Sequence, residues 1–396
     1  MNLKKLPLPI IFMFFGLYFL SAGVSFAVFS FLKQPAKIEK LISPLQKDIQ
    51  SKFNIDPNAP KTEVCPLTGK KYTQKEREIW EKSRPLTVMI ENHSDSRPQS
   101  GISKSDIVYE AVAEGGITRF LSIFYCDSSA YEITLGPVRS ARIYYLDFAQ
   151  EYGEYPLYAH VGGSNDYDGS GKTHKEARAL EKIATLGWRL YNDLDQSSIG
   201  FPSFWRDYER LGHPVATEHT VYTTNAKLLK VAEGRKLTNV DEDGVSWDKT
   251  FIPWQFKEEA SQDKRGNKSP LVSFWSGYTD YQVKWEYDPT TNAYKRLHGG
   301  QLQTDKNDNE PIVAKNVVVQ FTVEKGPVDE NKHVLYQTTG TGKALIFQDG
   351  NAIEATWLKK DSASRTKFTD SKGKEIAFNP GRIWLEIVPA GKEVQY

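Results

Sequence analysis

The stretch from Ile10 to Leu32 contains no charged residue, and Lys4 and Lys5 precede it. About 20 consecutive apolar residues are enough to cross a bilayer. We therefore expect a transmembrane anchor within residues 1–32. A cleaved signal peptide is the alternative, because the segment 25–27, Ser-Phe-Ala, fits a cleavage site. Both interpretations export the rest of the chain, and the anchor, which we favour, predicts a single-pass cell-membrane protein with extracytoplasmic globular domains.

The composition narrows the classes of partner. Fifty-one Lys and Arg residues against fifty Asp and Glu give a net charge of +1, so no global field attracts nucleic acid, and we predict no such partner. The two cysteines, Cys65 and Cys126, are too few for a disulfide framework or a thiolate metal site. The sequence leaves open whether they pair, and it does not indicate the oligomeric state.

The order of strand-like, helix-like and linker-like segments along the chain predicts an α+β protein. Residues 33–61 are polar and contain several prolines, which is typical of a spacer. Residues 62–256 alternate between strand and helix patterns and predict a mixed α/β domain. The charged stretch 257–270 suggests an interdomain linker, and residues 271–396 consist of strands and turns that predict an antiparallel β-rich domain.

The first domain contains a strong hairpin signal. Residues 106–114 and 117–126 alternate between apolar and polar side chains, and the pair Gly115-Gly116 separates them. Further strands are expected at 86–91 and 156–161. Helices are expected at 141–152 and from about 174 to 191, the second with Thr173 and Glu176 as a capping box.

The hairpin predicts an unusual arrangement of charges. If a two-residue loop joins the strands, Arg119 lies opposite Val112, with Glu110 and Glu114 as its diagonal neighbours on the same face. The other residues of that face are apolar, so the charges are expected to be at least half buried. Such charges either form a structural ion pair or serve a binding site, and the sequence does not decide between these alternatives.

Two further arginines stand where the helix at 141–152 is expected to begin. Arg139 and Arg142 flank Ser140, a plausible N-cap, and would place guanidinium groups beside exposed N–H donors. Such a place attracts an anion, which could be an internal carboxylate such as Glu110, Glu114 or Asp147, or the carboxylate or phosphate of a ligand. Other candidate ligand contacts are Asn92, Arg97, Gln99, His160, Arg206 and His219.

The sequence contains only fragments of catalytic motifs. Ser164 follows the strand that ends at His160, but Asp166 replaces the final glycine of a nucleophile elbow. Glu114 and His219 are the candidate acid and base. No pair of histidines has helical i, i+4 metal spacing, and the Asp-rich loop at 166–171 lacks the closing acid of a calcium loop. We predict no metal and no cofactor.

Longer segments resemble a known family. The segments "PLTG", "RPLTVMIENH", "RPQSGISKSDIVYEAVAEGGITRFLSIF", "GPVRSAR", "FWRD", "EHTVYT", "AKNVVVQF", "GTGKALIFQDG" and "GRIWLEIVP" are similar to those of the YerB-like bacterial surface proteins, a two-domain family of unknown function. The resemblance covers the chain from Cys65 to its end. It implies an α/β domain followed by a β-rich one and no established activity. Relatives are commonly lipoproteins, whereas this chain has no lipobox cysteine, which leaves its helix as the anchor.

Three hypotheses about function remain open, and the sequence does not decide whether the protein is an enzyme. In the first, Arg119, Arg139 and Arg142 bind an anionic cell-envelope ligand such as a glycan or peptide carboxylate. In this hypothesis Glu110 and Glu114 orient the arginines, and polar contacts at the rim come from Asn92, Arg97 and Gln99. In the second, the protein is a cell-wall hydrolase or transferase that uses Glu114 or His219 as acid or base, with Ser164 as a remote candidate nucleophile. In the third, the β-rich domain binds a partner through its strand edges.

Overall fold

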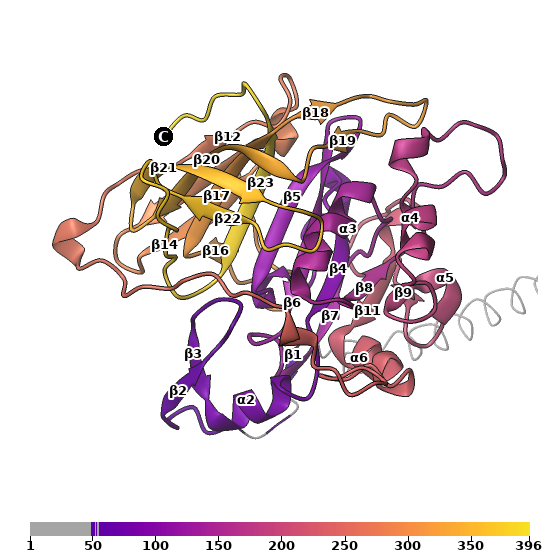
Figure 1. The fold of residues 1–396 in the computed structure, drawn as a ribbon, viewed down its shortest axis with the longest axis horizontal. Helices are drawn as coiled ribbons and strands as arrows, with labels where there is room; N and C mark the ends of the chain where they lie inside the picture. Colours follow the sequence, from indigo (N-terminus) through magenta and orange to yellow (C-terminus); the bar gives the residue numbers. More distant parts are fainter. Residues whose placement is uncertain (1–48, 52, 54) are drawn as a thin grey trace, which may run out of the picture. The chain divides into compact units, whose positions relative to one another are not determined.

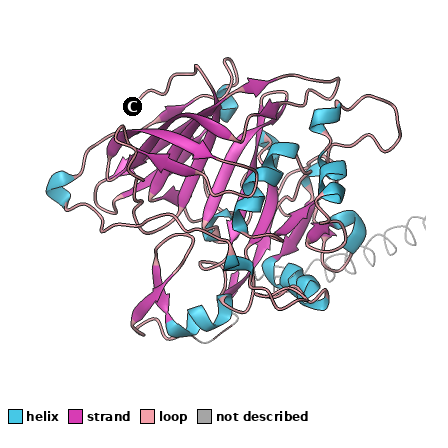
Figure 2. Cartoon of the chain, viewed as in Figure 1, coloured by secondary structure: helices cyan, strands magenta, loops and turns pink. Residues whose placement is uncertain are grey.

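The computed structural model describes residues 49–51, 53 and 55–396. The predicted anchor and the first part of the predicted spacer lie outside these residues. Within the described part of the chain, no helix combines the length and the apolar character needed to cross a membrane. Strands predominate, with short helices between them (Figure 2).

A 10-stranded sheet forms the centre of the described chain (Figure 1). In spatial order its strands are β22 (Lys367–Thr369), β21 (Asn351–Lys359), β20 (Gly340–Gln348), β17 (Asn316–Thr322), β23 (Ile383–Pro389), β5 (Ile107–Glu114), β6 (Ile117–Phe124), β4 (Leu86–Glu91), β8 (Leu157–His160) and β9 (Asp193–Asp195).

Strands from both predicted domains share this sheet. Strand β23, close to the C-terminus, pairs in parallel with β17 on one side and with β5 on the other. Its first six residues are all buried, as expected for a strand covered on both faces. The other pairings of C-terminal strands in this sheet are antiparallel. The mixed sheet with helices and the antiparallel β-rich C-terminal region are thus confirmed, while the domain boundaries stay a prediction.

Smaller sheets flank the large one. One contains β1 (Ile49–Ser51), β7 (Tyr131–Leu135), β11 (Val221–Thr224) and β10 (Trp205–Arg206), and another contains β12 (Leu271–Val272), β13 (Val283–Asp288), β14 (Ala293–His298), β15 (Gln301–Leu302) and β16 (Val313–Ala314). The two-stranded sheets are β2 (Lys61–Val64) with β3 (Lys71–Thr73) and β18 (Glu324–Lys325) with β19 (Leu335–Tyr336).

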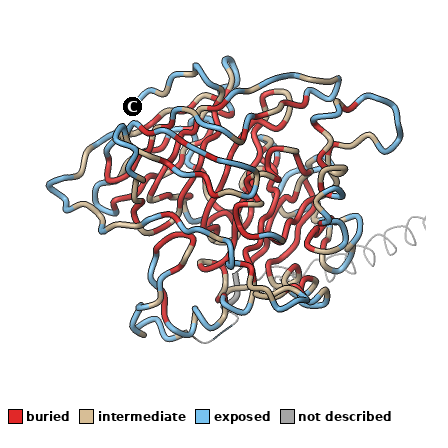
Figure 3. The backbone as a smooth tube through the Cα atoms, in the orientation of Figure 1, coloured by how far each residue is buried: buried red, intermediate tan, exposed pale blue. Residues whose placement is uncertain are grey.

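In the described part of the chain, five α-helices accompany the sheets: α2 (Gln74–Trp80), α3 (Ile143–Ala149), α4 (Ala179–Thr185), α5 (Gln196–Ile199) and α6 (Asn225–Gly234). Helix α3 lies against β5 and β6, because the hydroxyl group of Tyr145 donates to the carbonyl group of Arg119 and accepts from the N–H of Ala111. Tyr109 of β5 stacks on Phe148 of α3, with ring centroids 4.7 Å apart. The most continuous buried backbone follows the large sheet (Figure 3).

The helix expected from about 174 to 191 is shorter than predicted. His174, not Thr173, caps a short 3-10 turn over Lys175–Ala177, and α4 spans only Ala179–Thr185. The hydroxyl group of Ser164 donates to the carbonyl group of Ala177 and accepts from the N–H of Ala179. These bonds replace helical hydrogen bonds where the two pieces meet, so the predicted capping box and single continuous helix were wrong.

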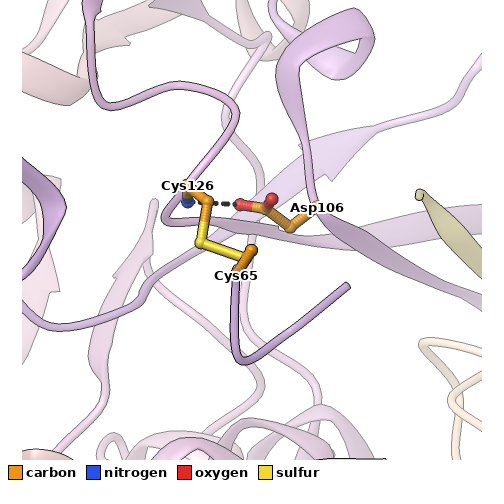
Figure 4. A group of neighbouring side chains, drawn as sticks. All are labelled: Cys65, Asp106 and Cys126. Atoms are coloured by element: carbon orange, nitrogen blue, oxygen red, sulfur yellow. Dashed lines mark hydrogen bonds between the residues drawn. A yellow bond between two sulfur atoms is a disulfide. The ribbon is translucent and has the colours of Figure 1, made fainter. Parts of the chain in front are cut away.

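A disulfide bond joins Cys65 and Cys126, which the sequence left open (Figure 4). Cys65 follows β2 and Cys126 follows β6, so the bond attaches the β2–β3 hairpin to the large sheet. The buried carboxyl group of Asp106 accepts N–H groups from Tyr125 and Cys126 beside it. Because both sulfur atoms are used in the bond, this group offers no thiolate for a metal ion.

The predicted linker at 257–270 packs closely on the turn between β20 and β21. The N–H of Gly266 donates to the carbonyl group of Asp349 at 2.9 Å, and the N–H of Lys268 donates to that of Gly350 at 2.8 Å. The Asp349 side chain pairs with Lys257 and accepts from Asn292. This segment is therefore an ordered part of the β-rich region.

Candidate functional site

Charged side chains gather at the carboxyl ends of the parallel strands β4 and β8, a common position for ligand sites in open α/β sheets. The segment 137–141 lies between these strand ends. Its residue Arg139 accepts a hydrogen bond from the N–H of Val161, after β8, and donates its own N–H to Met89 of β4. The predicted arginines Arg139 and Arg142 are thus brought to the same edge as Glu91, the last residue of β4.

Glu114 bridges two of the predicted arginines. Its Oε1 accepts from Nη2 of Arg119 at 2.7 Å, and its Oε2 accepts from Nε of Arg142 at 3.0 Å. Burial opposes ionisation of Glu114, but attraction to Arg119 and Arg142 outweighs burial and lowers its pKa to about 2. Arg142 is the N-cap residue of α3, in place of the expected Ser140. Glu114 is therefore a permanent anion at neutral pH.

The third predicted arginine has a different carboxylate partner. Nε of Arg139 lies 2.5 Å from Oε2 of Glu91, and Nδ1 of His219 lies 3.5 Å from the same oxygen. Burial raises the pKa of Glu91, but His219, Arg119 and Arg139 together lower it below its usual value. We call Arg119, Arg139, Arg142, Glu91 and Glu114 the arginine cluster.

Positive charge exceeds negative charge in the arginine cluster. Its three guanidinium groups face two carboxylates, and every guanidinium group contacts one of them. Arg119 is buried, whereas 26% of the Arg139 side chain is exposed. Neither Nη atom of Arg139 donates a hydrogen bond to any other residue in the described part of the chain. Among the described residues, the Nη atoms of Arg139, the most exposed of the three arginines, are therefore free, and the buried Nε of Arg119 also has no hydrogen-bond partner.

Glu110 does not belong to this cluster, contrary to the prediction. A β-bulge between Val112 and Glu114 shifts the register, so Ala111 faces Arg119 and Glu110 lies on the opposite face of the sheet. There Glu110 forms a fully buried ion pair with Arg296. Burial and the nearby Glu110 raise the pKa of Glu386, which lies beside this pair, well above its usual value.

The expected rim residues Asn92 and Gln99 belong to the same buried network as Glu110. Asn92 donates to Thr118 at 2.6 Å and to Glu110 at 3.3 Å, and Gln99 donates to Asn92 at 2.8 Å. Gln303 of the β-rich region donates in turn to Gln99 at 2.8 Å. These contacts connect the two regions of the chain.

Arg97 also crosses to the β-rich region. Its guanidinium group donates to the carbonyl group of Asp280 at 2.9 Å and lies over the ring of Tyr281. Burial lowers the pKa of Arg97 to about 10. Asn92, Gln99 and Arg97 therefore all have structural partners in this network.

His160 forms a second buried polar group. Its Nε2 lies 2.6 Å from Asp193, and its Nδ1 lies 2.7 Å from the carbonyl oxygen of Gly162. Burial lowers the pKa of His160, but the hydrogen bond and charge of Asp193 and the charge of Asp195 raise it above its usual value overall. Because both ring nitrogens have acceptors, His160 is not free to activate Ser164.

The remaining candidates are separate from these groups. Ser164 is occupied by backbone hydrogen bonds to Ala177 and Ala179, as described above. Arg206 donates to the carbonyl group of Thr217 at 2.6 Å and to the hydroxyl group of Thr220 at 3.0 Å, and so holds the turn that carries His219. A general acid or base needs a pKa near the working pH, which the low pKa of Glu114 does not provide.

Sequence reasoning missed Glu91, Arg296 and His93. Glu91 could have been found, because it is a carboxylate at the end of an otherwise apolar strand. Arg296 and its carboxylate partners are far apart in sequence, and no local pattern indicates that they meet. His93 stacks on His219, with ring centroids 4.8 Å apart, although many residues separate the two histidines.

Two family models match the chain. The one described as "Protein of unknown function (DUF3048) N-terminal domain" matches residues 67–238, and the one for the C-terminal domain of DUF3048 matches residues 272–385.

Relatives from one organism agree with these matches. The chain is 32% identical over 352 residues to "Putative lipoprotein YerB" of Bacillus subtilis (strain 168), which covers 88% of this chain and 91% of that protein. The crystal structure of YerB protein from Bacillus subtilis matches with a TM-score of 0.67 at 28% identity, over 85% of this chain and 100% of that chain. The resemblance found in the sequence is confirmed: the chain belongs to the DUF3048 family of proteins of unknown function and is a relative of YerB.

Proposed function

We propose that this protein is anchored to the cell membrane, faces the extracytoplasmic side and binds an anionic cell-envelope ligand at the arginine cluster. The anchoring and location are supported by the apolar stretch from Ile10 to Leu32 and by the lipoprotein name of the Bacillus subtilis relative. The Cys65–Cys126 disulfide adds support, because disulfides persist mainly in oxidising compartments.

One observation carries the binding proposal. Glu91 contacts Nε of Arg139 and so orients the guanidinium group, while both Nη atoms remain without a hydrogen-bond partner among the described residues. An oriented guanidinium fork matches the geometry of a carboxylate or phosphate. The excess positive charge of the cluster favours an anion at this position. Glycan and peptide carboxylates of the envelope have the required chemistry.

Binding can be tested with the full chain in detergent by isothermal titration calorimetry. The probe is N-acetylmuramyl dipeptide, which carries a free carboxylate, and its uncharged amide serves as the reference ligand. We expect the acid to bind and Arg139→Ala to weaken binding at least tenfold, because a charge-assisted pair is lost. The melting temperature of ligand-free Arg139→Ala should stay close to that of the wild type.

Arg77→Ala is the matched control, because Arg77 is an exposed arginine outside the cluster and is paired with Glu63 and Glu81. This variant should bind the acid like the wild type. Equal binding of acid and amide, or unchanged affinity of Arg139→Ala, would contradict the proposal. The hydrolase and strand-edge hypotheses gain no specific support from the contacts described above.

A further inference from the structure

Two histidines and an aspartate meet beside the arginine cluster. One possible ligand atom from each of His93, Asp95 and His219 lies within 4.8 Å of the other two. His93 caps a short turn over Ser94–Ser96 that carries Asp95, and His219 ends a second short turn over Thr217–His219. The three side chains are thus held by two segments that only the fold brings together.

The spacing between His93 and Asp95 suits a small metal ion. Nδ1 of His93 lies 3.8 Å from Oδ2 of Asp95. Two ligands of one tetrahedral zinc ion, each about 2.0–2.1 Å from the metal, lie about 3.4 Å apart. Nδ1 of His93 accepts a hydrogen bond of 3.2 Å from the N–H of Asp95. This nitrogen therefore already lies beside the carboxylate group of Asp95.

His219 supplies an independent observation. Its side chain is more than nine-tenths buried, and its Nδ1 makes no hydrogen bond of normal geometry to any residue in the described part of the chain. Glu91, which pairs with Arg139, lies 3.5 Å from this nitrogen. A carboxylate behind one ring nitrogen of a histidine is the usual companion of metal ligation through the other nitrogen.

Solvent can reach this group. The side chain of Asp95 is 62% exposed and that of His93 is 30% exposed, so an ion can enter and keep a water molecule or a ligand at an open position. Two imidazoles with one carboxylate are a ligand set typical of open zinc sites. Calcium and magnesium prefer sites made of oxygen ligands.

We propose that His93, Asp95 and His219 bind one divalent transition-metal ion, for which Zn²⁺ is the best match, and that Glu91 positions His219. Nδ1 of His219 then pairs with Glu91, and Nε2 is the ligand atom. The sequence analysis predicted no metal because the histidines lack helical i, i+4 spacing. This proposal goes beyond anion binding and does not depend on it.

Metal titration of the full chain in detergent, after dialysis against EDTA, tests the proposal. We expect one equivalent of Zn²⁺ to bind by calorimetry and to raise the melting temperature. Co²⁺ should give the visible absorption bands of a tetrahedral site. Absence of binding, or binding of Zn²⁺ without these Co²⁺ bands, would overturn the proposed geometry.

Two histidine variants distinguish Zn²⁺ binding at this site from Zn²⁺ binding to other histidines on the surface. His93→Ala should reduce the affinity for Zn²⁺ at least 100-fold, and because His93 is partly exposed the fold should tolerate the change, as its unchanged metal-free melting temperature would verify. His213→Ala removes an exposed histidine elsewhere and should bind Zn²⁺ like the wild type. Unchanged affinity in His93→Ala, or an equal loss in His213→Ala, would refute the site.

The role of Glu91 needs a readout of its own. Glu91→Gln should keep one equivalent of Zn²⁺ but bind it about 10-fold to 100-fold more weakly. Unchanged affinity would remove Glu91 from the proposal. His93→Ala should still bind the muramyl dipeptide through Arg139, so failure of the metal proposal and failure of the anion proposal can be distinguished.

Discussion

Glu114 shows how a single carboxylate can stabilise two buried cations. Arg119 and Arg142 both depend on it. Nη1 of Arg119 also donates to the carbonyl group of Ser140, and Nη1 of Arg142 donates to that of Ala141. Removing one partner of a buried ion pair leaves an uncompensated charge, which costs more than the pair itself contributes. At the residue scale, the protonation state of Glu114 therefore affects the stability of the fold.

The first prediction concerns the pH dependence that Glu114 causes. Its pKa is about 2 in the folded protein and 4.5 by reference, so its contribution to stability is fully present above pH 4.5 and is lost as the pH falls towards 2. The contribution amounts to about 3 kcal/mol. We expect the stability difference between the wild type and Glu114→Gln to shrink between pH 4.5 and pH 2, as measured by urea unfolding.

Glu286→Gln serves as the control for this measurement. Glu286 is an exposed carboxylate that pairs with Lys284, and exposed pairs contribute little to stability. Its substitution should leave both the stability and its pH profile close to those of the wild type. A pH-independent difference between the wild type and Glu114→Gln would contradict the assigned ion pairs.

At the scale of elements, the β20–β21 hairpin organises the β-rich region. The carbonyl groups of its turn residues Asp349 and Gly350 accept hydrogen bonds from the backbone N–H groups of Gly266 and Lys268. Gly350 has a φ of +67°, and a Cβ atom added there would lie 2.4 Å from the carbonyl oxygen of Gly266. The turn therefore requires glycine for two reasons, backbone conformation and close approach.

The second prediction follows from this contact. Gly350→Ala should destabilise the protein by about 1–2 kcal/mol for the left-handed backbone and by a further 1–3 kcal/mol for the clash with backbone atoms. Gly162→Ala is the matched control, because Gly162 has a φ of +57° but no neighbouring atom within 4 Å of the added Cβ. Guanidinium unfolding measures both variants, and equal losses would exclude the clash.

At the scale of the described chain, β23 joins the two regions into one sheet, and the disulfide attaches the β2–β3 hairpin to it. The buried pair of Glu110 and Arg296 also links the regions. Stability should therefore depend on contacts between segments that are distant in sequence.

The third prediction concerns the disulfide. The bond closes a loop with a sequence separation of 61 residues, and its removal should lower the free energy of unfolding by up to about 4 kcal/mol, chiefly through the entropy of the unfolded chain. Guanidinium unfolding of the wild type with and without a reductant measures the loss. The double variant Cys65→Ser, Cys126→Ser should not respond to the reductant, and an unchanged wild type would contradict a formed bond.

Local patterns predicted many elements correctly. The strands that became β4, β5, β6 and β8 were all indicated, and Gly115-Gly116 does form the turn between β5 and β6. The pairing register was not predictable, because the bulge before Glu114 moves Glu110 to the opposite face. The predicted helix from about 174 to 191 is not continuous, because the hydroxyl group of Ser164 forms hydrogen bonds with the backbone of Ala177 and Ala179.

The sequence by itself determined the alternation of strands and helices, the tight glycine turn and the family, because these depend on residues close to one another or on long matching segments. It also identified Arg119 as a cation that is at least half buried, and Arg139 and Arg142 as cations at the expected start of a helix. Only the tertiary structure decided which carboxylate each arginine meets and that His93 lies beside His219. Charges and metal ligands act through space over a few ångströms, and separation along the chain does not encode those distances.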